Sequence, residues 1–355
     1  MKRWIVALYA LLTACAGVTE PEEECMRIDL STTFDKQPEK VVLDQWASSV
    51  RFIPLETNDS ILIPYISRIV KHGDKLLVQH ENRASVFNLD GKYLYDIGRQ
   101  GGGPDEFSRL SELVPHDDLI YIKEGGNQIK VYGWDGRYIR SKMIPGRGIR
   151  SIYPLPGSDL IVGHVPNFSG SIQNRFYFFR DTTLLDSIPN HKTYREPLFV
   201  MVFTNEFRPF DGNRTTAFKE LFCDTVFKVN KENKLLPYTI LDLGKYHTPE
   251  DLRYNLTMDQ AMNSPFSDKI VPILSGEVGD KIYMHNFSDK IAYTLCYDKV
   301  HKKVSYLELV YPDNSYEFPE KSVFSPRFIS DDNQYLINWE QPENDSNPVV
   351  ILVKP

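Results

Sequence analysis

Histidine, carboxylate, amide and lysine side chains recur at the ends of short apolar segments in this 355-residue chain. His80, His164 and His285 each close such a segment, and so do Glu81 and Glu124. Imidazole and carboxylate groups that converge could bind a divalent cation or act as acid and base on a substrate. Their spacing matches no metal-binding or catalytic motif, so any such chemistry requires segments far apart in sequence to meet in the fold.

The segments that position these residues belong to an internal repeat. The stretch 86–94, VFNLDGKYL, matches 131–139, VYGWDGRYI, at an offset of 45 residues. Upstream the match continues at an offset of 44, where Ile69 and His72 correspond to Leu113 and His116. Self-similarity at a fixed period indicates one structural unit used more than once.

Each unit predicts four antiparallel strands. In the first unit they lie near Ile66–Lys71, Lys75–His80, Ala84–Leu89 and Lys92–Ile97. Asp90-Gly91 joins the last two strands, and Asp-Gly between alternating apolar runs is a strong hairpin signal. The aromatic content of 12% also favours β-structure. Four strands recurring at about 45 residues are typical of a β-propeller blade.

Weaker copies extend the pattern to the end of the chain. We expect the third at Ile149–Tyr153, Asp159–His164, Arg175–Arg180 and Thr183–Ile188; the fourth at Thr216–Phe222, Thr225–Val229 and Pro237–Leu243; the fifth at Ile270–Leu274, Lys281–His285, Ile291–Tyr297 and Val304–Val310; the sixth at Phe328–Ser330, Tyr335–Trp339 and Val349–Val353. Residues 189–215 and 245–266 read as insertions. The strand Val50–Leu55 would complete the sixth blade and close the ring. The sequence therefore predicts an all-β, six-bladed β-propeller over residues 41–355.

The first residues predict export. Lys2 and Arg3 precede a short apolar stretch that ends in Leu12-Thr13-Ala14-Cys15, which resembles the lipobox of bacterial lipoproteins. On that resemblance residues 1–15 are a signal that ends at a lipidated Cys15, which attaches the mature chain to a membrane. Residues 16–40 then read as a polar tether with an acidic cluster at 20–24.

The blade pattern, the GRQGGGPDEF segment at 98–107 and the lipobox together resemble the six-bladed β-propeller lipoproteins of Bacteroidota. These are relatives of NHL-repeat and TolB-like propellers. The resemblance covers roughly residues 40–355. It implies an outer-membrane lipoprotein that faces the periplasm or the cell surface, and it implies no particular activity.

Propeller geometry brings the ends of the second strands to one face, around the central channel. We expect on this face Gln79, His80, Glu81, Lys123, Glu124, His164, Asn167, His285, Asn286, Asn338, Trp339 and Glu340, with Arg99 and Gln100 on a neighbouring loop. A ligand-binding site and an ordinary solvated rim both fit this set. His72 and His116 occupy equivalent turn positions on the opposite face, where we interpret them as turn residues.

Two loops have compositions that could indicate a function. The glycine run 101–103 lacks the Lys-Ser/Thr pair and helix of a phosphate loop and is followed by acidic residues, so we interpret it as a connection between blades anchored by Phe107. The segment 205–214 mixes aromatic and charged residues. Such a loop suits sugar stacking or a protein contact, or simply covers the ring.

The net charge of -7 argues against nucleic acid as a partner, because binding phosphates needs a basic face. We expect a non-enzymatic, lipid-anchored binding or scaffolding module whose ligand is a glycan, a peptide or an outer-membrane partner protein. No catalytic residue, metal site or cofactor is predicted. Two alternatives stay open. One is a lactonase- or esterase-like hydrolase that uses calcium and the channel-face carboxylates, and the other is a purely structural component of a membrane complex.

Overall fold

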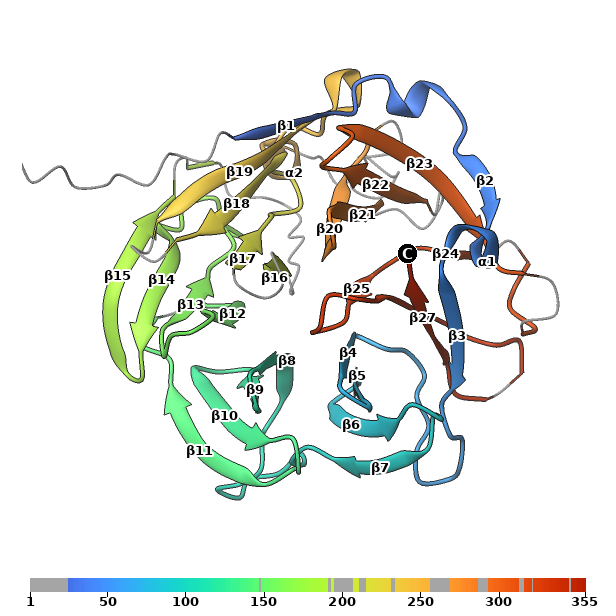
Figure 1. Cartoon of the computed structure of the whole chain (residues 1–355). Helices are drawn as coiled ribbons and strands as arrows, with labels where there is room; N and C mark the ends of the chain where they lie inside the picture. Colours follow the sequence, from blue (N-terminus) through green and yellow to red (C-terminus); the bar gives the residue numbers. More distant parts are fainter. Residues whose placement is uncertain are drawn as a thin grey trace, which may run out of the picture.

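The structure, a computed structural model, is an all-β ring of six antiparallel sheets around a central channel (Figure 1). It describes residues 25–146, 148–190, 193–194, 207–210, 215–230, 234–255, 269–286, 293–312, 316–320, 322–344 and 346–355. The predicted six-bladed β-propeller is confirmed. The predicted signal segment and its lipidation site Cys15 lie outside the described residues.

The first three blades each contain four strands in sequence order from the channel outward. They are blade 1, β4 (Arg68–His72), β5 (Lys75–His80), β6 (Arg83–Asn88) and β7 (Tyr93–Asp96); blade 2, β8 (Leu110–His116), β9 (Leu119–Glu124), β10 (Gln128–Gly133) and β11 (Tyr138–Met143); and blade 3, β12 (Ser151–Pro154), β13 (Ile161–His164), β14 (Asn174–Arg180) and β15 (Thr183–Pro189).

The other three blades follow the same plan. They are blade 4, β16 (Phe207–Phe210), β17 (Thr215–Phe218), β18 (Thr225–Val229) and β19 (Leu235–Asp242); blade 5, β20 (Pro272–Val278), β21 (Lys281–Asn286), β22 (Thr294–Asp298) and β23 (Lys303–Val310); and blade 6, β25 (Phe328–Ile329), β26 (Leu336–Glu340), β27 (Val349–Lys354) and β3 (Ser49–Pro54). A further short strand, β24 (Val323–Phe324), pairs with β23.

The Asp-Gly turns form the predicted hairpins, but only the glycine of each pair has a positive φ, so they are not type I′ turns, which need positive φ at both central residues. Gly91 and Gly136 both have φ of 81°, a conformation that side chains with a Cβ rarely adopt. In both outer hairpins the pairing register shifts by one residue. The shift lies between Val86 and Phe87 in blade 1 and between the equivalent residues Val131 and Tyr132 in blade 2. The two repeats therefore share the same bulged outer hairpin.

The N-terminal strand β3 closes the ring, as predicted. It pairs antiparallel with β27 along its whole length, and Ile53 lies opposite Val350. Blade 6 is thus built from both ends of the propeller. Because β27 gains a partner on its outer side, no blade is left incomplete.

The core consists of apolar layers between neighbouring blades rather than one central cluster. One layer joins blades 1 and 2 through Val86, Ile97, Phe107 and Ile122, and another joins blades 6 and 1 through Ile53, Val78 and Ile337. Phe107 is buried between blades, which confirms that the glycine run beside it is an inter-blade connection. Since both faces of each blade are covered by neighbours, the middle strands are buried along most of their length, as in β5, β9 and β13.

The predicted tether is wrong for its C-terminal part. Strand β1 (Met26–Asp29) pairs in parallel with β19, and β2 (Glu39–Val42) pairs in parallel with β23. A short 3-10 helix, η1 (Thr33–Asp35), joins these strands, and α1 (Leu43–Trp46) follows β2. Residues 26–42 therefore form a strap along the outer edges of blades 4 and 5 (Figure 1).

The reading of 189–215 as an insertion is also wrong in part, because β16 within it is the innermost strand of blade 4. The same strand occupies the middle of the segment 205–214, and the rest of that segment lies outside the described residues. Blade 4 is followed by the 3-10 helix η2 (Gly244–Tyr246) and by α2 (Leu252–Asn255). No helix in the described ranges is long and apolar enough to cross a membrane.

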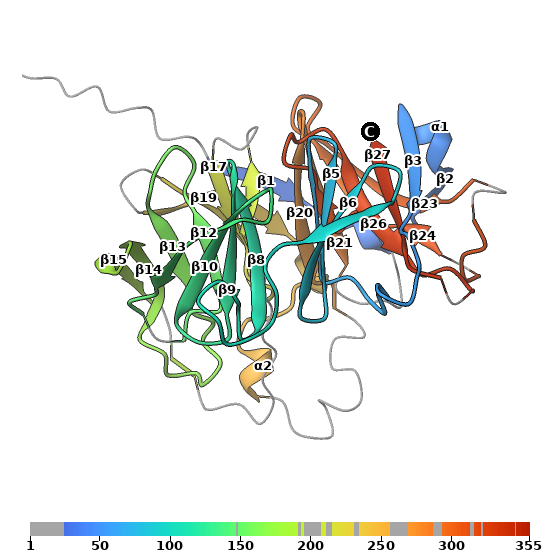
Figure 2. The ribbon, with the colours of Figure 1, turned by 90° about the horizontal axis from the view of Figure 1, so that it is seen from below.

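The ring has two distinct faces. The helix α2 lies on one of them and the C-terminus lies on the other (Figure 2). In each blade the innermost strand runs from the α2 face to the C-terminal face, and the second strand returns to the α2 face. The predicted ligand-binding residues at the second-strand ends thus belong to the α2 face.

Candidate functional site

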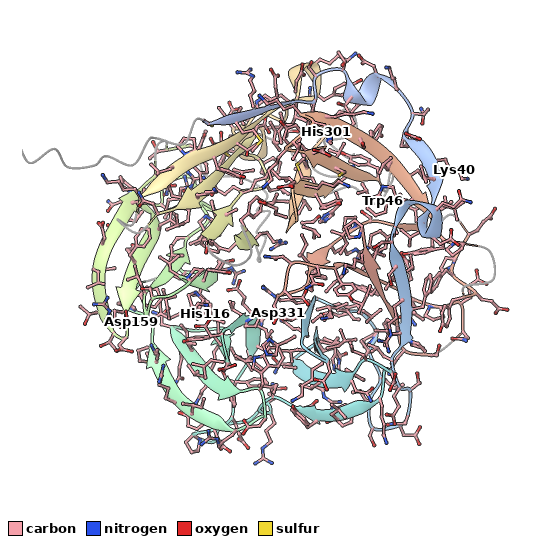
Figure 3. All side chains as sticks on the ribbon, in the orientation of Figure 1. Lys40, Trp46, His116, Asp159, His301 and Asp331 are labelled. Atoms are coloured by element: carbon pink, nitrogen blue, oxygen red, sulfur yellow. The ribbon has the colours of Figure 1, made fainter. Side chains whose placement is uncertain are left out.

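The central channel holds a cavity of about 430 Å³ to which all six blades contribute. It is lined by Arg68, Ile69, Val70 and His72 of blade 1, Pro115, His116, Asp117 and Asp118 of blade 2, Tyr153 and Pro156 of blade 3, Arg208 of blade 4, Ser275 of blade 5, and Phe328, Ile329 and Asp331 of blade 6. Figure 3 shows His116 and Asp331 beside the central opening, whereas Asp159 and His301 lie near the periphery. Asp117, Asp118, Pro156 and Asp331 lie in the turns that follow inner strands, so the cavity reaches the C-terminal face, where these strands end.

Strand alternation explains why blade 1 supplies both ends of the lining. Arg68, Val70 and His72 are two residues apart in β4, so they share one side of the strand. Val70 packs with blade 2, and Ile69, on the other side, packs with blade 6. Arg68 begins the strand near the α2 face, and His72 ends it at the C-terminal face.

Two arginines and a tyrosine converge in the deep part of the cavity. Burial raises the pKa of Tyr153 to about 12, although the positive charges of Arg68 and Arg208 both act in the opposite direction. Burial also lowers the pKa of Arg68, against the attraction of Glu112. The Glu112 carboxylate accepts a 2.8 Å hydrogen bond from the amide of Ile152. This region thus contains two guanidinium groups and one carboxylate in a partly desolvated environment.

Arg208 is held in place by the main chain of its own strand and of blade 5. Its Nε donates to the carbonyl of Leu274 at 3.1 Å, and its Nη1 donates to the carbonyl of Phe207 at 2.9 Å. Next to Leu274, the Ser275 hydroxyl donates to the carbonyl of Pro326 at 2.5 Å. Its oxygen also lies 2.9 Å from Nδ1 of His285. The donors in the deep part of the cavity are therefore fixed before any ligand arrives.

The mouth of the cavity is acidic and contains two histidines. The Asp331 carboxylate accepts a hydrogen bond from Nδ1 of His72, and the His72 ring stacks on Trp134 with 4.2 Å between ring centroids. His116 Nε2 lies 3.4 Å from a carboxylate oxygen of Asp117. Burial lowers the pKa of His116 and raises that of Asp331. The interaction of His72 with Asp331 joins blade 1 to blade 6, and its stacking on Trp134 joins blade 1 to blade 2.

The residues predicted at the second-strand ends lie elsewhere, and none of them lines this cavity. Several are buried in contacts within or between blades. His80 is fully buried and its Nε2 lies 2.9 Å from the Ser85 hydroxyl, which donates to Asp96 at 2.6 Å. Burial lowers the pKa of His80 to about 4, with Arg83 adding to the effect.

The other predicted residues are mostly engaged in the same way. His164 Nε2 lies 3.0 Å from Glu220, which also pairs with Arg175. Further contacts join Glu124 to the amide of Ser108, Lys123 to the carbonyl of Glu124, Asn167 to the amide of Ile172, Asn338 and Glu340 to the Tyr311 hydroxyl, and Trp339 to the Arg327 guanidinium. Gln79 is buried, and Asn286 is half-buried and pairs with Pro272 across two strands.

Only three of the predicted residues are well exposed, namely Glu81, Arg99 and Gln100. Arg99 bonds Glu106 at 2.6 Å within the glycine-rich connection. Most of the predicted residues on the α2 face therefore make contacts within or between blades. Their role in ligand binding stays a prediction. Within the described ranges, no group of three or more His, Cys, Asp or Glu side chains is arranged to hold a metal ion.

The sequence analysis missed most of the cavity residues. It interpreted His72 and His116 as turn residues, whereas they are the last residues of the inner strands β4 and β8 and line the cavity. One signal for the site was present. Arg68 and His72 correspond to Glu112 and His116 at the repeat offset of 44 residues. Near the start of the inner strand, blade 1 has an arginine where blade 2 has a glutamate. At the end of that strand, both blades have a histidine. Polar residues repeated on the side of an inner strand that faces the channel predict a site more directly than polar strand ends do.

A family described as a domain of unknown function (DUF4934) matches residues 25–354. No curated protein matches the chain. Among solved structures, a Bacteroides fragilis protein described as exported has 14% identity and a TM-score of 0.68, with 93% of this chain and 99% of that chain covered. A member of the DUF4221 family from Bacteroides vulgatus has 10% identity and a TM-score of 0.55, with 87% and 97% covered.

A third solved structure is virginiamycin B lyase from Staphylococcus aureus. It has 13% identity and a TM-score of 0.43, and the alignment covers 86% of this chain and 99% of that chain. The two Bacteroides structures support the fold. The lyase is too distant to inform the chemistry of this chain.

Proposed function

The chain belongs to the DUF4934 family, and on that premise we propose that it is an exported, non-enzymatic binding protein whose ligand enters the central cavity from the C-terminal face. The observation that carries this proposal is the cavity itself. Its volume of about 430 Å³ lies in the range of small-molecule sites, and it combines an apolar middle with fixed polar groups. A short segment of a peptide or glycan would also fit, whereas a folded partner would not.

The side chains that line the cavity are held in place by contacts within and between blades before any ligand binds. Arg208 and Ser275 are held by main-chain carbonyls, and His72 is held by Asp331 and Trp134. Side chains that are already ordered lose little entropy when a ligand binds. These contacts support a selective binding site rather than a water-filled passage through the ring.

A narrowed mouth tests this proposal. Pro156 lies in a surface turn of blade 3 and lines the cavity, so Pro156→Trp would place an indole over the opening. Asp159→Trp, in the same turn region but near the periphery in Figure 3, is the matched control. The purified proteins would be incubated with the small-molecule fraction of a bacterial envelope extract and analysed by native mass spectrometry.

We expect a bound small molecule on the wild type and on Asp159→Trp, and at least a tenfold lower occupancy on Pro156→Trp. Equal occupancy on all three proteins would place the ligand outside the cavity. No bound species on the wild type would contradict the binding function.

We further propose that the protein is a lipoprotein of the outer membrane, anchored through Cys15. The lipobox-like sequence supports this proposal, and a Bacteroides fragilis structure with the same fold is described as exported. Cys15→Ala should move the protein from the membrane fraction to the soluble fraction. A variant that stays in the membrane fraction would contradict lipid anchoring.

A calcium-dependent hydrolase that uses the α2-face carboxylates is not proposed, because no observation favours it. Glu124 accepts a 2.6 Å hydrogen bond from the Ser108 amide, and Glu340 accepts a 3.0 Å bond from the Tyr311 hydroxyl. The two carboxylates therefore serve contacts in blades 2 and 6, and Glu81 is an exposed turn residue.

A further inference from the structure

We infer that the ligand of the cavity is a dipolar molecule, with an anionic group held at Arg68 and Arg208 and a cationic group held at the acidic mouth, and that a peptide of three or four residues with free termini fits this arrangement. The inference rests on the proposed function, since it names the class of ligand for the same cavity. It follows from how charge changes with depth along the channel.

The deep end of the cavity favours an anion. Arg68, Arg208 and Tyr153 line the same cavity from blades 1, 4 and 3. The charges of both arginines act on the Tyr153 hydroxyl, and that of Asp117 acts on it in the opposite direction. Burial disfavours the charge of Arg68, and Glu112 offsets this only in part. A carboxylate placed among these donors would form charge-assisted hydrogen bonds in a region that water screens poorly.

The mouth favours a cation. Asp117, Asp118 and Asp331 line it, and the basic groups that line it with them are His72 and His116. Lys71 does not line the cavity, but its charge acts on Asp331 and it pairs with Asp332 at 3.2 Å. Because burial lowers the pKa of His116, that ring stays neutral at neutral pH. The Asp117 side chain is 78% exposed, so its charge faces the opening, although one of its carboxylate oxygens lies 3.4 Å from Nε2 of His116. An ammonium group is therefore attracted to the opening.

The distance between the two ends limits the length of the ligand. Arg68 and His72 mark the two ends of β4 and are four residues apart, which corresponds to about 13 Å along a strand. An extended peptide spans at most about 3.5 Å per residue, so three or four residues reach from one end to the other. Between them, Val70, Phe328 and Ile329 offer an apolar wall for small side chains.

The test uses three forms of one probe and the intact protein. Tetra-alanine carries both charges, N-acetyl-tetra-alanine lacks the ammonium group, and tetra-alanine amide lacks the carboxylate. Isothermal titration calorimetry at neutral pH and low salt should show that the doubly charged peptide binds, and that each capped form binds at least tenfold more weakly. Because this comparison changes the ligand only, it does not depend on how a variant folds.

Two variants locate the charges. Asp118→Asn should weaken binding of tetra-alanine but leave binding of the N-acetyl form unchanged, since that form has no ammonium group to lose. Asp159→Asn removes an exposed carboxylate at the periphery of the same face and should change neither. Arg208→Met should weaken tetra-alanine and leave the amide form unchanged, and its melting temperature should be measured to confirm that it folds.

The outcomes separate this inference from the proposed function. Equal affinity for the three forms, lost in Pro156→Trp, would leave a cavity-binding protein and overturn the dipolar ligand. Failure of tetra-alanine to bind would likewise overturn the peptide assignment, whereas the native mass spectra decide the binding function by themselves. If the doubly charged form binds tenfold more tightly than the capped forms, and Pro156→Trp abolishes this binding, the result would support both the dipolar ligand and the cavity-binding function.

Discussion

Buried histidines on the α2 face act as neutral hydrogen-bonding groups. Burial is the largest cause that lowers the pKa of His80 to about 4 and that of His285 to about 3, and neighbouring arginines lower both further. Each ring contacts a serine hydroxyl, Ser85 and Ser275 respectively. Protonating either ring would place a buried positive charge near an arginine. Both histidines therefore make the free energy of unfolding depend on pH in the acidic range.

The direction of that sensitivity follows from proton uptake. In the unfolded chain both histidines take up a proton near pH 6.5, whereas in the folded protein they do so only near pH 4 and pH 3. The stabilisation is therefore complete above pH 6.5 and is lost as the pH falls toward 4. Between pH 7 and pH 5 each histidine should remove about 2 kcal/mol from the free energy of unfolding.

Urea denaturation at pH 7 and pH 5 measures this loss. His80→Gln should lower stability at pH 7 but should also reduce the difference between the two pH values by about 2 kcal/mol. Val78→Ala, at a fully buried apolar residue of the same strand, is the control and should lower stability equally at both pH values. An unchanged difference in His80→Gln would contradict a neutral buried ring at position 80.

The residue scale is also where the sequence was least informative. His80, His164 and His285 were correctly placed at second-strand ends, but their burial depends on partners such as Ser85 and Glu220, and local sequence does not show which polar group will be covered. The cavity residues were harder still. Arg68 and Tyr153 converge only because blades 1 and 3 share one channel, and the sequence contains no local sign of that meeting.

At the scale of elements, local patterns predicted most strands because blade pairing is between sequence neighbours. Strand β16 was missed because Phe207-Arg208-Pro209-Phe210 does not resemble a strand. Proline has no amide to donate and is tolerated at sheet edges. An innermost propeller strand is an edge, since it pairs on one side only, and Pro115, Pro154 and Pro272 lie in the inner strands of blades 2, 3 and 5.

The strap formed by β1 and β2 was also missed, for a different reason. Its pairing is with strands more than 200 residues away, as in Met26 with Thr239 and Glu39 with Leu307. Pairs of that separation leave no local pattern, and β2 is polar and mostly exposed in its first half. What the strap does is cover two outer edges that would otherwise present free backbone groups.

Two truncations distinguish the strap from the closing strand. Removal of residues 1–47 deletes β1, β2 and α1 but keeps β3, so the six blades stay complete. We expect a folded protein with a modestly lower melting temperature and a greater tendency to associate through the exposed edges of blades 4 and 5.

Removal of residues 1–56 also deletes β3 and exposes Ile351 and Val353 of blade 6, which are now fully buried. This variant should lose cooperative unfolding in a calorimetric scan or fail to fold. If the two truncations had equal melting temperatures, the closing strand would not be what completes the ring.

At the scale of the whole molecule, the closed ring is what makes a site from six blades. Each blade contributes between one and four residues to the cavity, and none could form it alone. The sequence predicted the number of blades and the closure because both follow from counting strands. It did not predict which end of the channel would be hollow, because that depends on the volume of side chains meeting from opposite blades.

Closure also predicts that the order of blades along the chain is not essential to the fold. The amide and the hydroxyl of Ser48 both donate to the carbonyl of Lys354, at 2.8 and 2.9 Å, so the two ends of the propeller are adjacent. A short glycine-serine linker from Pro355 to Ser48 would therefore span them without strain. New termini can then be opened in the turn between Gly157 and Ser158, where both residues are exposed.

This circular permutant should fold, with one cooperative transition and a stability within about 2 kcal/mol of the variant that lacks residues 1–47, because every strand keeps its partners and only loop-closure entropy changes. A second permutant opened between Leu77 and Val78 is the control, since it cuts a fully buried middle strand and should not fold. Calorimetric scans of the three proteins make the comparison. Loss of the cooperative transition in the first permutant would mean that the junction of β3 with β27 must form in a fixed order, and that closure is not a purely geometric property of the ring.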